Sequence, residues 1–167
     1  GDLVLHPIAW IDQKPPEHIE LDLSTLNDDE KWIIDHAEKS LHKSTVRGGG
    51  FLNHFLGFHP QPGERSAYCE LVNGPHIGNR VGHVQGGITL GLAMVTANAS
   101  LSNHWKLTGV TASYISPGEG AAISARSTVV HRGRLTAVVH TEVLSSNGRK
   151  VLEVMTTHAS KPAEATS

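Results

Sequence analysis

Cysteine is almost absent from this chain, since Cys69 is the only one among its 167 residues. A single thiol cannot form an internal disulfide, and this favours a reducing compartment. A catalytic role for Cys69 would require a base close to it in space. Cys69 lies within Tyr68–Val72, a strand-like stretch, and we therefore predict a small buried hydrophobic residue rather than a nucleophile.

The sequence also has few aromatic residues, no marked excess of charge and no long apolar run. Aromatic residues make up 5% of the chain, so the core must consist mainly of Val, Leu, Ile and Ala. With 14 basic and 16 acidic residues the net charge is -2, which argues against a nucleic-acid or anionic-membrane partner. The longest apolar run, Gly86 to Ala97, is too short to cross a bilayer. The N-terminus has acids and prolines where a signal peptide has basic and apolar parts, and we expect a cytoplasmic protein.

The length fits one domain, which we place at residues 46–160, after an N-terminal extension over residues 1–45. Within the extension, Asn27 is a helix cap followed by acidic residues, and the apolar spacing predicts a surface helix over 28–43. Gly48 to Gly50 is a flexible joint rather than a phosphate-binding loop, because no strand precedes it and no Gly-Lys-Ser/Thr follows. Residues 161–167 are expected to form a disordered tail.

The hydrophobic period changes after residue 65. Tyr68–Val72 reads as a strand, and a Gly-, Pro- and Asn-rich loop runs from Asn73 to Gly82. The segment from Gly86 to Leu101 is apolar or small on every side. A helix with this pattern has to be covered all round.

Four more strands are predicted after this helix, and short turns separate them. In the third of them Ala137, Val139, Thr141 and Val143 alternate with more polar residues, as in a half-buried sheet. Loops this short join antiparallel neighbours. The pattern predicts an α+β fold in which a curved antiparallel sheet is wrapped around a central buried helix. The strands are expected over Thr108–Ile115, Ala121–His131, Leu135–Leu144 and Val151–His158.

Four short motifs occur in order along residues 65–160. The first, NRVGHVQGG from Asn79 to Gly87, lies at the start of the predicted helix. The other three are Tyr114 to Gly118 (YISPG), His131 to Arg134 (HRGR) and Ser146 to Leu152 (SNGRKVL). With these motifs the chain resembles the hot-dog fold thioesterases of the phenylacetic-acid-degradation type, whose helix-start motif is N-x-x-G-x-x-H-G-G.

The resemblance implies an acyl-CoA thioesterase that needs no cofactor or metal and forms a homodimer or homotetramer. Its thioester carbonyl would be held by the N–H groups of Gly86 and Gly87, which as the first of a helix lack internal partners and lie at the positive end of its dipole. A structural alternative is that these glycines only let the helix start close to the sheet. No H-E-x-x-H or similar histidine spacing points to a metal site.

Two positions depart from the family pattern. Gln85 replaces the family's histidine, although an amide can still bind a carbonyl or orient a water molecule. Met94 stands where the resemblance expects the catalytic Asp or Glu, and it can neither accept a proton nor position water. Asn98, one turn further along, and His83, in the approach loop, are the candidate replacements.

The remaining candidates are binding residues. Asn79, Met94 and His54 are expected to border the substrate, and Arg132 and Arg134, with Arg80, could meet the phosphates of CoA. Glu70 could reach the site only if its strand face points inward.

The loss of the acid at Met94 leaves a second hypothesis open, a non-catalytic acyl-CoA-binding protein. A third, a hydratase or dehydratase, is less favoured because the Asp-x4-His arrangement of that branch is absent. The retained Asn79 and glycine pair favour the hydrolase.

Overall fold

The computed structural model describes residues 22–160. Residues 1–21 of the expected N-terminal extension and the expected tail at 161–167 lie outside the described residues. The elements, in order, are a short 3-10 helix at Leu23–Thr25, then α1 (Asp28–Arg47), α2 (Phe51–Leu56), β1 (Gln61–Gly63), β2 (Ser66–Val72), α3 (Gly86–Ala99), β3 (Trp105–Tyr114), β4 (Ala122–Arg132), β5 (Thr136–Ser145) and β6 (Lys150–Ser160).

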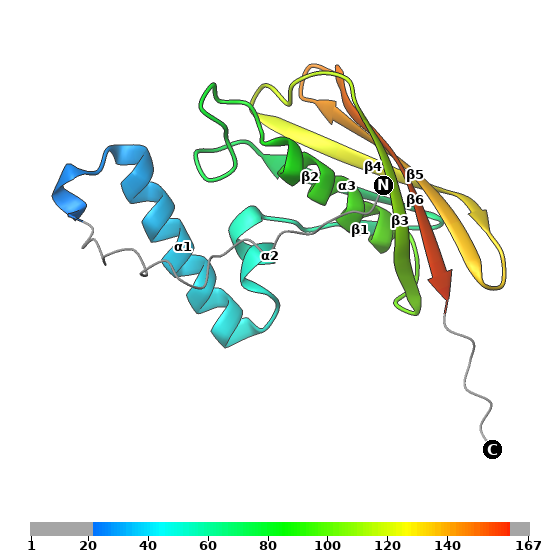
Figure 1. Cartoon of the computed structure of the whole chain (residues 1–167). Coiled ribbons are helices and arrows are strands. Elements are labelled where there is room, and N and C mark those ends of the chain that lie inside the picture. The colour runs from blue at the N-terminus through cyan, green and yellow to red at the C-terminus, as the bar shows by residue number, and fades with distance from the viewer. Residues whose placement is uncertain (1–21, 161–167) are drawn as a thin grey trace, which may run out of the picture.

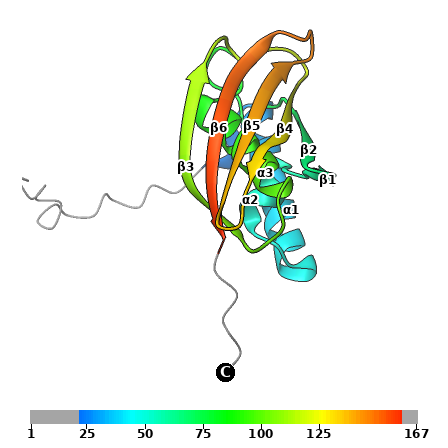
Figure 2. The ribbon, with the colours of Figure 1, turned by 90° about the vertical axis from the view of Figure 1, so that its right-hand side faces the viewer.

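The strands form one antiparallel six-stranded sheet in the order β1-β2-β4-β5-β6-β3. The sheet is curved, and α3 lies across its concave face (Figures 1 and 2). The alternation predicted for the third strand is confirmed in β5, where Ala137, Val139, Thr141 and Val143 are all buried. The predicted α+β class and the curved antiparallel sheet around a helix are therefore confirmed.

Helix α3 is buried on the side that faces the sheet. Leu92, Ala93 and Ala97 are fully buried there, and Leu92 shares the main core with Leu71 and Val143. The buried hydroxyl of Thr96 donates to Leu92 O at 2.6 Å, so it leaves no unpaired polar group. This intrahelical bond explains how a helix with threonines can face an apolar core.

The expectation that α3 is covered on every side is not met within one chain. Gly86, Gly87 and Asn98 are exposed. A single sheet contacts only one side of a helix. The apolar residues on the opposite side of α3 could therefore be covered only by something outside this chain.

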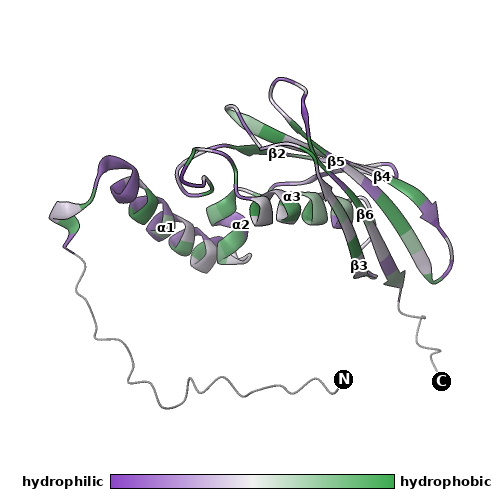
Figure 3. Ribbon diagram, turned by 45° about the horizontal axis from the view of Figure 1, so that its top comes forward, coloured by the Kyte–Doolittle hydropathy of each residue, from purple (hydrophilic) through white to green (hydrophobic). Residues whose placement is uncertain are grey.

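Helix α1 stands away from the sheet and packs on α2 (Figure 1). The predicted Asn27 cap is confirmed, and it forms a capping box in which Asn27 Oδ1 accepts from the Glu30 N–H and the Glu30 carboxylate accepts from the Asn27 N–H. The first turn of α1 is strongly hydrophilic, whereas α3 is mostly apolar (Figure 3). The helix extends to Arg47, four residues past the end predicted at residue 43.

Rings from three segments join α1 to the rest of the molecule. Trp32 stacks on His36 at 4.7 Å, and His76 from the loop after β2 lies 4.8 Å from His36 and 5.5 Å from Phe55 of α2. No helix among residues 22–160 is long and apolar enough to span a membrane.

His158 is a titratable group inside the core. Its side chain on β6 is 1% exposed, and its Nε2 lies 2.9 Å from Thr156 Oγ1, while Nδ1 has no hydrogen-bond partner. Burial lowers the pKa of His158. Burial, and secondarily the neighbouring His36, also lowers the pKa of His76.

We expect the protein to lose stability as the pH falls below about 6.5, the ordinary imidazole pKa. Because the folded-state pKa of both histidines is lowered, the unfolded chain takes up protons first, and this favours unfolding. Their contribution is complete above that pH and is lost progressively below it. Urea unfolding between about pH 7.5 and about pH 5.5 measures the effect. His158→Gln should weaken the pH dependence and the exposed His104→Gln should not; equal slopes in the two variants would contradict this assignment.

Candidate active site

The loop before α3 is folded back on itself and positions the start of the helix. The Gln85 N–H donates to Ile77 O at 3.0 Å, and the Asn79 N–H donates to His83 O at 2.7 Å. Val84, between these bonds, is buried and forms bridges to Gly78 and to Gly118 of the β3–β4 turn. The helix start is thus held by two neighbouring segments.

Gly86 and Gly87 form the first turn of α3, and both are exposed. Among residues 22–160, no acceptor is hydrogen-bonded to their N–H groups. A Cβ at Gly87 would meet no atom within 4 Å, so its backbone faces open space. Free N–H groups at the positive end of a 14-residue helix can bind a carbonyl oxygen and stabilise an oxyanion.

Gly86 has an additional packing reason to be glycine. The Tyr114 hydroxyl donates to Gly86 O at 2.9 Å, and a Cβ at Gly86 would lie 3.3 Å from the Tyr114 ring. Both glycines have ordinary helical backbone angles, since neither has a positive φ. The tight start against the sheet therefore accounts for Gly86, whereas open access accounts for Gly87.

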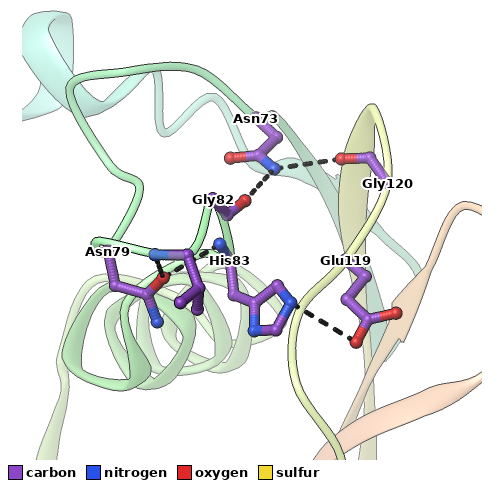
Figure 4. Close-up of polar contacts among 7 residues, drawn as sticks. Asn73, Asn79, Gly82, His83, Glu119 and Gly120 are labelled. Carbon is purple, nitrogen blue, oxygen red and sulfur yellow. Dashed lines mark hydrogen bonds and ion pairs between the residues drawn. The ribbon is translucent and has the colours of Figure 1, made fainter.

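A histidine and a carboxylate lie together beside this helix start. His83 Nε2 is 3.5 Å from Glu119 Oε1, and both side chains are only partly exposed (Figure 4). Asn73 Nδ2 donates to Gly82 O at 3.2 Å and to Gly120 O at 3.0 Å, which joins the residues next to His83 and Glu119. Gly82 and Gly120 both have positive φ, a conformation that favours glycine.

Asn79, expected to bind substrate, has its side-chain oxygen engaged in the loop. Its Oδ1 accepts from the N–H groups of Val81 and His83, both at 3.0 Å. Figure 4 shows the contact between Asn79 and His83. This arrangement fixes the backbone of His83. In the described structure Asn79 shapes the loop.

The structure brings together Gln85, His83, Gly86 and Gly87, and it separates Met94 and Asn98 from them. Gln85 is the exposed N-cap of α3 and its side chain makes no capping hydrogen bond. At 1.5 Å per residue, Met94 and Asn98 lie about 12 Å and about 18 Å along the axis from Gly86. Within one chain, neither can contact a carbonyl held at Gly86.

The arginines of the expected phosphate site lie at the other end of the molecule. Arg132 and Arg134 flank the β4–β5 turn, next to the small core cluster around Leu101 and Trp105 beyond the C-terminal end of α3. Arg132 is ten residues from Ala122, which places it about 33 Å along the strand from the end near Gly86. Arg80 is exposed in the loop before α3 and lines a pocket with Asp29 and Glu30 at the start of α1.

His54 lines a pocket of about 490 Å³ between α1, α2 and the end of β2. Trp32, Phe55 and His76 contribute to the same pocket, and His54 Nε2 lies 3.0 Å from Gly48 O. No contact of the described residues joins His54 to Gly86.

Successive side chains of β2 point to opposite faces of the sheet, and this determines the positions of Cys69 and Glu70. Cys69 is buried in the core, as predicted, and burial raises the pKa of its thiol. Glu70 is exposed, accepts a hydrogen bond from Tyr68 Oη at 2.9 Å, and points away from the core side of the sheet. The condition set for Glu70 as a site residue is therefore not met.

A second polar cluster lies on β5 and β6, on sheet positions that alternate with the buried ones. His140, Glu142 and Glu153 could together hold a cation, but Lys150 Nζ already contacts both carboxylates, at 2.5 Å and 3.4 Å. The bond to Glu142 raises the pKa of Lys150, and the bond from His140 lowers the pKa of Glu153. Lys150 takes the place that a metal ion would occupy.

Glu119, Tyr114 and Asn73 have contacts at the site that sequence reasoning missed. In the sequence Glu119 lies in the short turn between two predicted strands, and Tyr114 belongs to a family motif, but neither position indicates a contact with the helix start. Their proximity to the helix start depends on the bridge between Val84 and Gly118, which joins residues far apart in the chain. A pattern in a short stretch of sequence cannot predict such a long-range contact.

Comparison with known proteins identifies the family. The family model for the acyl-CoA thioesterase N-terminal domain matches residues 75–160. No relative matches among curated proteins.

Solved structures share the fold. A Bacillus halodurans protein determined with CoA is 24% identical, with a TM-score of 0.71 over 86% of this chain and 100% of that one. The PaaI protein of the E. coli phenylacetic acid degradation operon is 19% identical, with a TM-score of 0.62 over 77% and 95%. A thioesterase of Haemophilus influenzae is 15% identical, with a TM-score of 0.63 over 74% and 90%. Since the family match spans more than half of the chain and includes α3 and strands β3 to β6, this protein belongs to the acyl-CoA thioesterase family and is a hot-dog enzyme of the thioesterase class.

Proposed function

We propose that this protein hydrolyses an acyl-CoA thioester by direct attack of water on a carbonyl bound at the start of α3. The observation that carries the proposal is the pair of unengaged N–H groups at Gly86 and Gly87, with open space in front of Gly87. A carbonyl oxygen bound there is polarised, and its negative charge in the tetrahedral intermediate is stabilised by the same groups.

CoA is the proposed carrier of the acyl group. The family description supports this, and the Bacillus halodurans relative was determined with CoA. The exposed Arg80, which is six residues before Gly86 in the chain, is the proposed phosphate contact within the chain. Arg132 and Arg134 can serve only a site built at their own end of the sheet.

A homodimer is proposed as the working unit. The outer side of α3 is open, and β3 is an edge strand with Val110 and Tyr114 exposed. Pairing of two copies would cover an exposed strand edge and the open side of the helix. Because Asn98 lies about 18 Å from Gly86 along α3, it can act on the bound carbonyl only from a second copy.

The competing function is a non-catalytic acyl-CoA-binding protein, and Met94 is the observation that favours it. Met94 is partly exposed on α3 and could line an acyl channel without supplying a proton acceptor. The same N–H groups would then bind the thioester without hydrolysis.

Release of free thiol from short, long and aromatic acyl-CoAs tests the proposal. Gly87→Ala puts a methyl group where the carbonyl approaches. It should lower kcat/KM about 10²-fold, because the methyl group displaces the carbonyl from the N–H groups that bind it. Gly50→Ala is the matched control, since a Cβ there also meets no atom within 4 Å and its φ is -75°. If Gly87→Ala abolishes turnover and Gly50→Ala preserves it, the result supports hydrolysis at this site. Absence of turnover together with measurable acyl-CoA binding would establish the binding protein instead.

A further inference from the structure

The family position for the catalytic carboxylate holds Met94, so the hydrolytic reaction needs another proton acceptor. We propose that His83 is that general base and that Glu119 is the positioning residue that orients its imidazole. This inference rests on the proposed thioester hydrolysis and names the group that activates the water.

The placement of His83 supports the assignment. His83 is three residues before Gly86, so the two Cα atoms lie within about 10 Å even at full extension. Met94 and Asn98 lie further along the helix, at about 12 Å and about 18 Å. The His83 side chain is 32% exposed, which leaves it open to water.

The backbone that carries the pair is fixed from several directions. Asn79 Oδ1 accepts a hydrogen bond from the His83 N–H, and the Asn79 N–H donates one to His83 O. The Val84 N–H donates to Gly118 O at 2.9 Å, which aligns the residue after His83 with the residue before Glu119. Asn73 then ties Gly82 to Gly120 on the opposite flank (Figure 4). These hydrogen bonds restrict the backbone on both sides of His83 and Glu119, as an oriented acid–base pair requires.

The orientation of the imidazole assigns a role to each of its nitrogens. Nε2 lies 3.5 Å from Glu119 Oε1, an ion-pair contact that a small side-chain movement would shorten to a hydrogen bond, and catalytic contacts of this kind often tighten only when substrate is bound. With its proton on Nε2, the neutral ring presents the unprotonated Nδ1 on the other side. The carboxylate beside Nε2 favours this tautomer.

The step can be written in full. The water oxygen bonds to the thioester carbon while Nδ1 of His83 takes one water proton, and the carbonyl electron pair moves to the oxygen held by Gly86 and Gly87. When the tetrahedral intermediate collapses, the carbon–sulfur bond breaks and the thiolate takes the proton from the imidazolium. The products are a carboxylic acid and free CoA thiol.

A double-mutant cycle on the full-length protein tests the inference. His83→Ala should lower kcat by about 10²-fold or more and Glu119→Ala by about tenfold, with KM nearly unchanged, in line with general-base contributions. Because Glu119 acts through His83, the double variant should be no slower than His83→Ala alone. Glu119→Asp should recover part of the lost rate. Glu64→Ala, which removes another exposed turn carboxylate, should leave kcat unchanged.

The nitrogen-15 spectrum of the His83 ring gives a readout that does not depend on turnover. It should report the Nε2–H tautomer in the wild type and a loss of that preference in Glu119→Ala. Additive rate losses in the cycle, or a kcat that Glu119→Ala leaves intact, would overturn the inference while thioesterase activity stands. A wild type that turns over no acyl-CoA, with the tautomer preference present, would instead remove the proposed hydrolysis and with it the catalytic role of the pair.

Discussion

Replacing Gly86 with proline is expected to lower kcat by about 10²–10³-fold, the cost of removing one preorganised oxyanion donor. Proline deletes the Gly86 N–H and should do so without breaking the helix. Gly86 is the first residue of α3, where proline is tolerated, and Gln85 before it has φ -59° and ψ 139°, the extended conformation that a residue before proline prefers.

Gly86→Ala is the matched control for this substitution. Both variants place a Cβ at 3.3 Å from the Tyr114 ring, but alanine keeps the N–H. The ratio of kcat between the two variants therefore isolates the hydrogen-bond donor from the crowding. Steady-state thiol release measures the ratio, and thermal unfolding checks that both proteins are folded. Equal kcat in the two variants would assign the carbonyl to the Gly87 N–H alone.

The sheet and its helix could be predicted because each depends on a local period. Strand alternation placed Ala137 and Val139 inside, and Gly86 with its apolar run placed the start of α3 correctly. The predicted start of the strand after α3 is wrong by three residues: β3 begins at Trp105 rather than Thr108, because the buried Trp105 pairs with Ser160 of β6. The six-residue helix α2 was identified only as an apolar segment, since such a short stretch carries little periodicity.

The site could be predicted only where it lies on one contiguous segment. Gly86, Gly87 and His83 belong to one motif, and the structure keeps them together. Glu119 comes from a turn more than thirty residues later and reaches His83 through the Val84–Gly118 bridge, which is a tertiary contact. Asn98 was expected to be buried because the helix carries no polar face, but one chain covers only one side of α3.

Truncating Leu92 to alanine is expected to lower the free energy of unfolding by about 2–5 kcal/mol, the range for removing a buried leucine side chain. Leu92 is 0% exposed and packs with Leu71, Ile123 and Val143 between α3 and the sheet. The closely packed neighbours cannot fill the space left, so the loss includes a cavity term beyond the transfer of apolar area.

Leu41→Ala provides the comparison, because Leu41 is also on a helix but is 58% exposed on α1. Its unfolding free energy should change by less than about 0.5 kcal/mol. Both variants are compared by urea unfolding at one protein concentration, since any association of copies would make stability concentration-dependent. A small effect at Leu92 would mean that α3 is not anchored to the sheet through this side chain. A large effect with unchanged kcat per folded molecule would mean that the helix start is positioned by its own loop contacts, through Val84 and Tyr114, more than by the core beneath the helix.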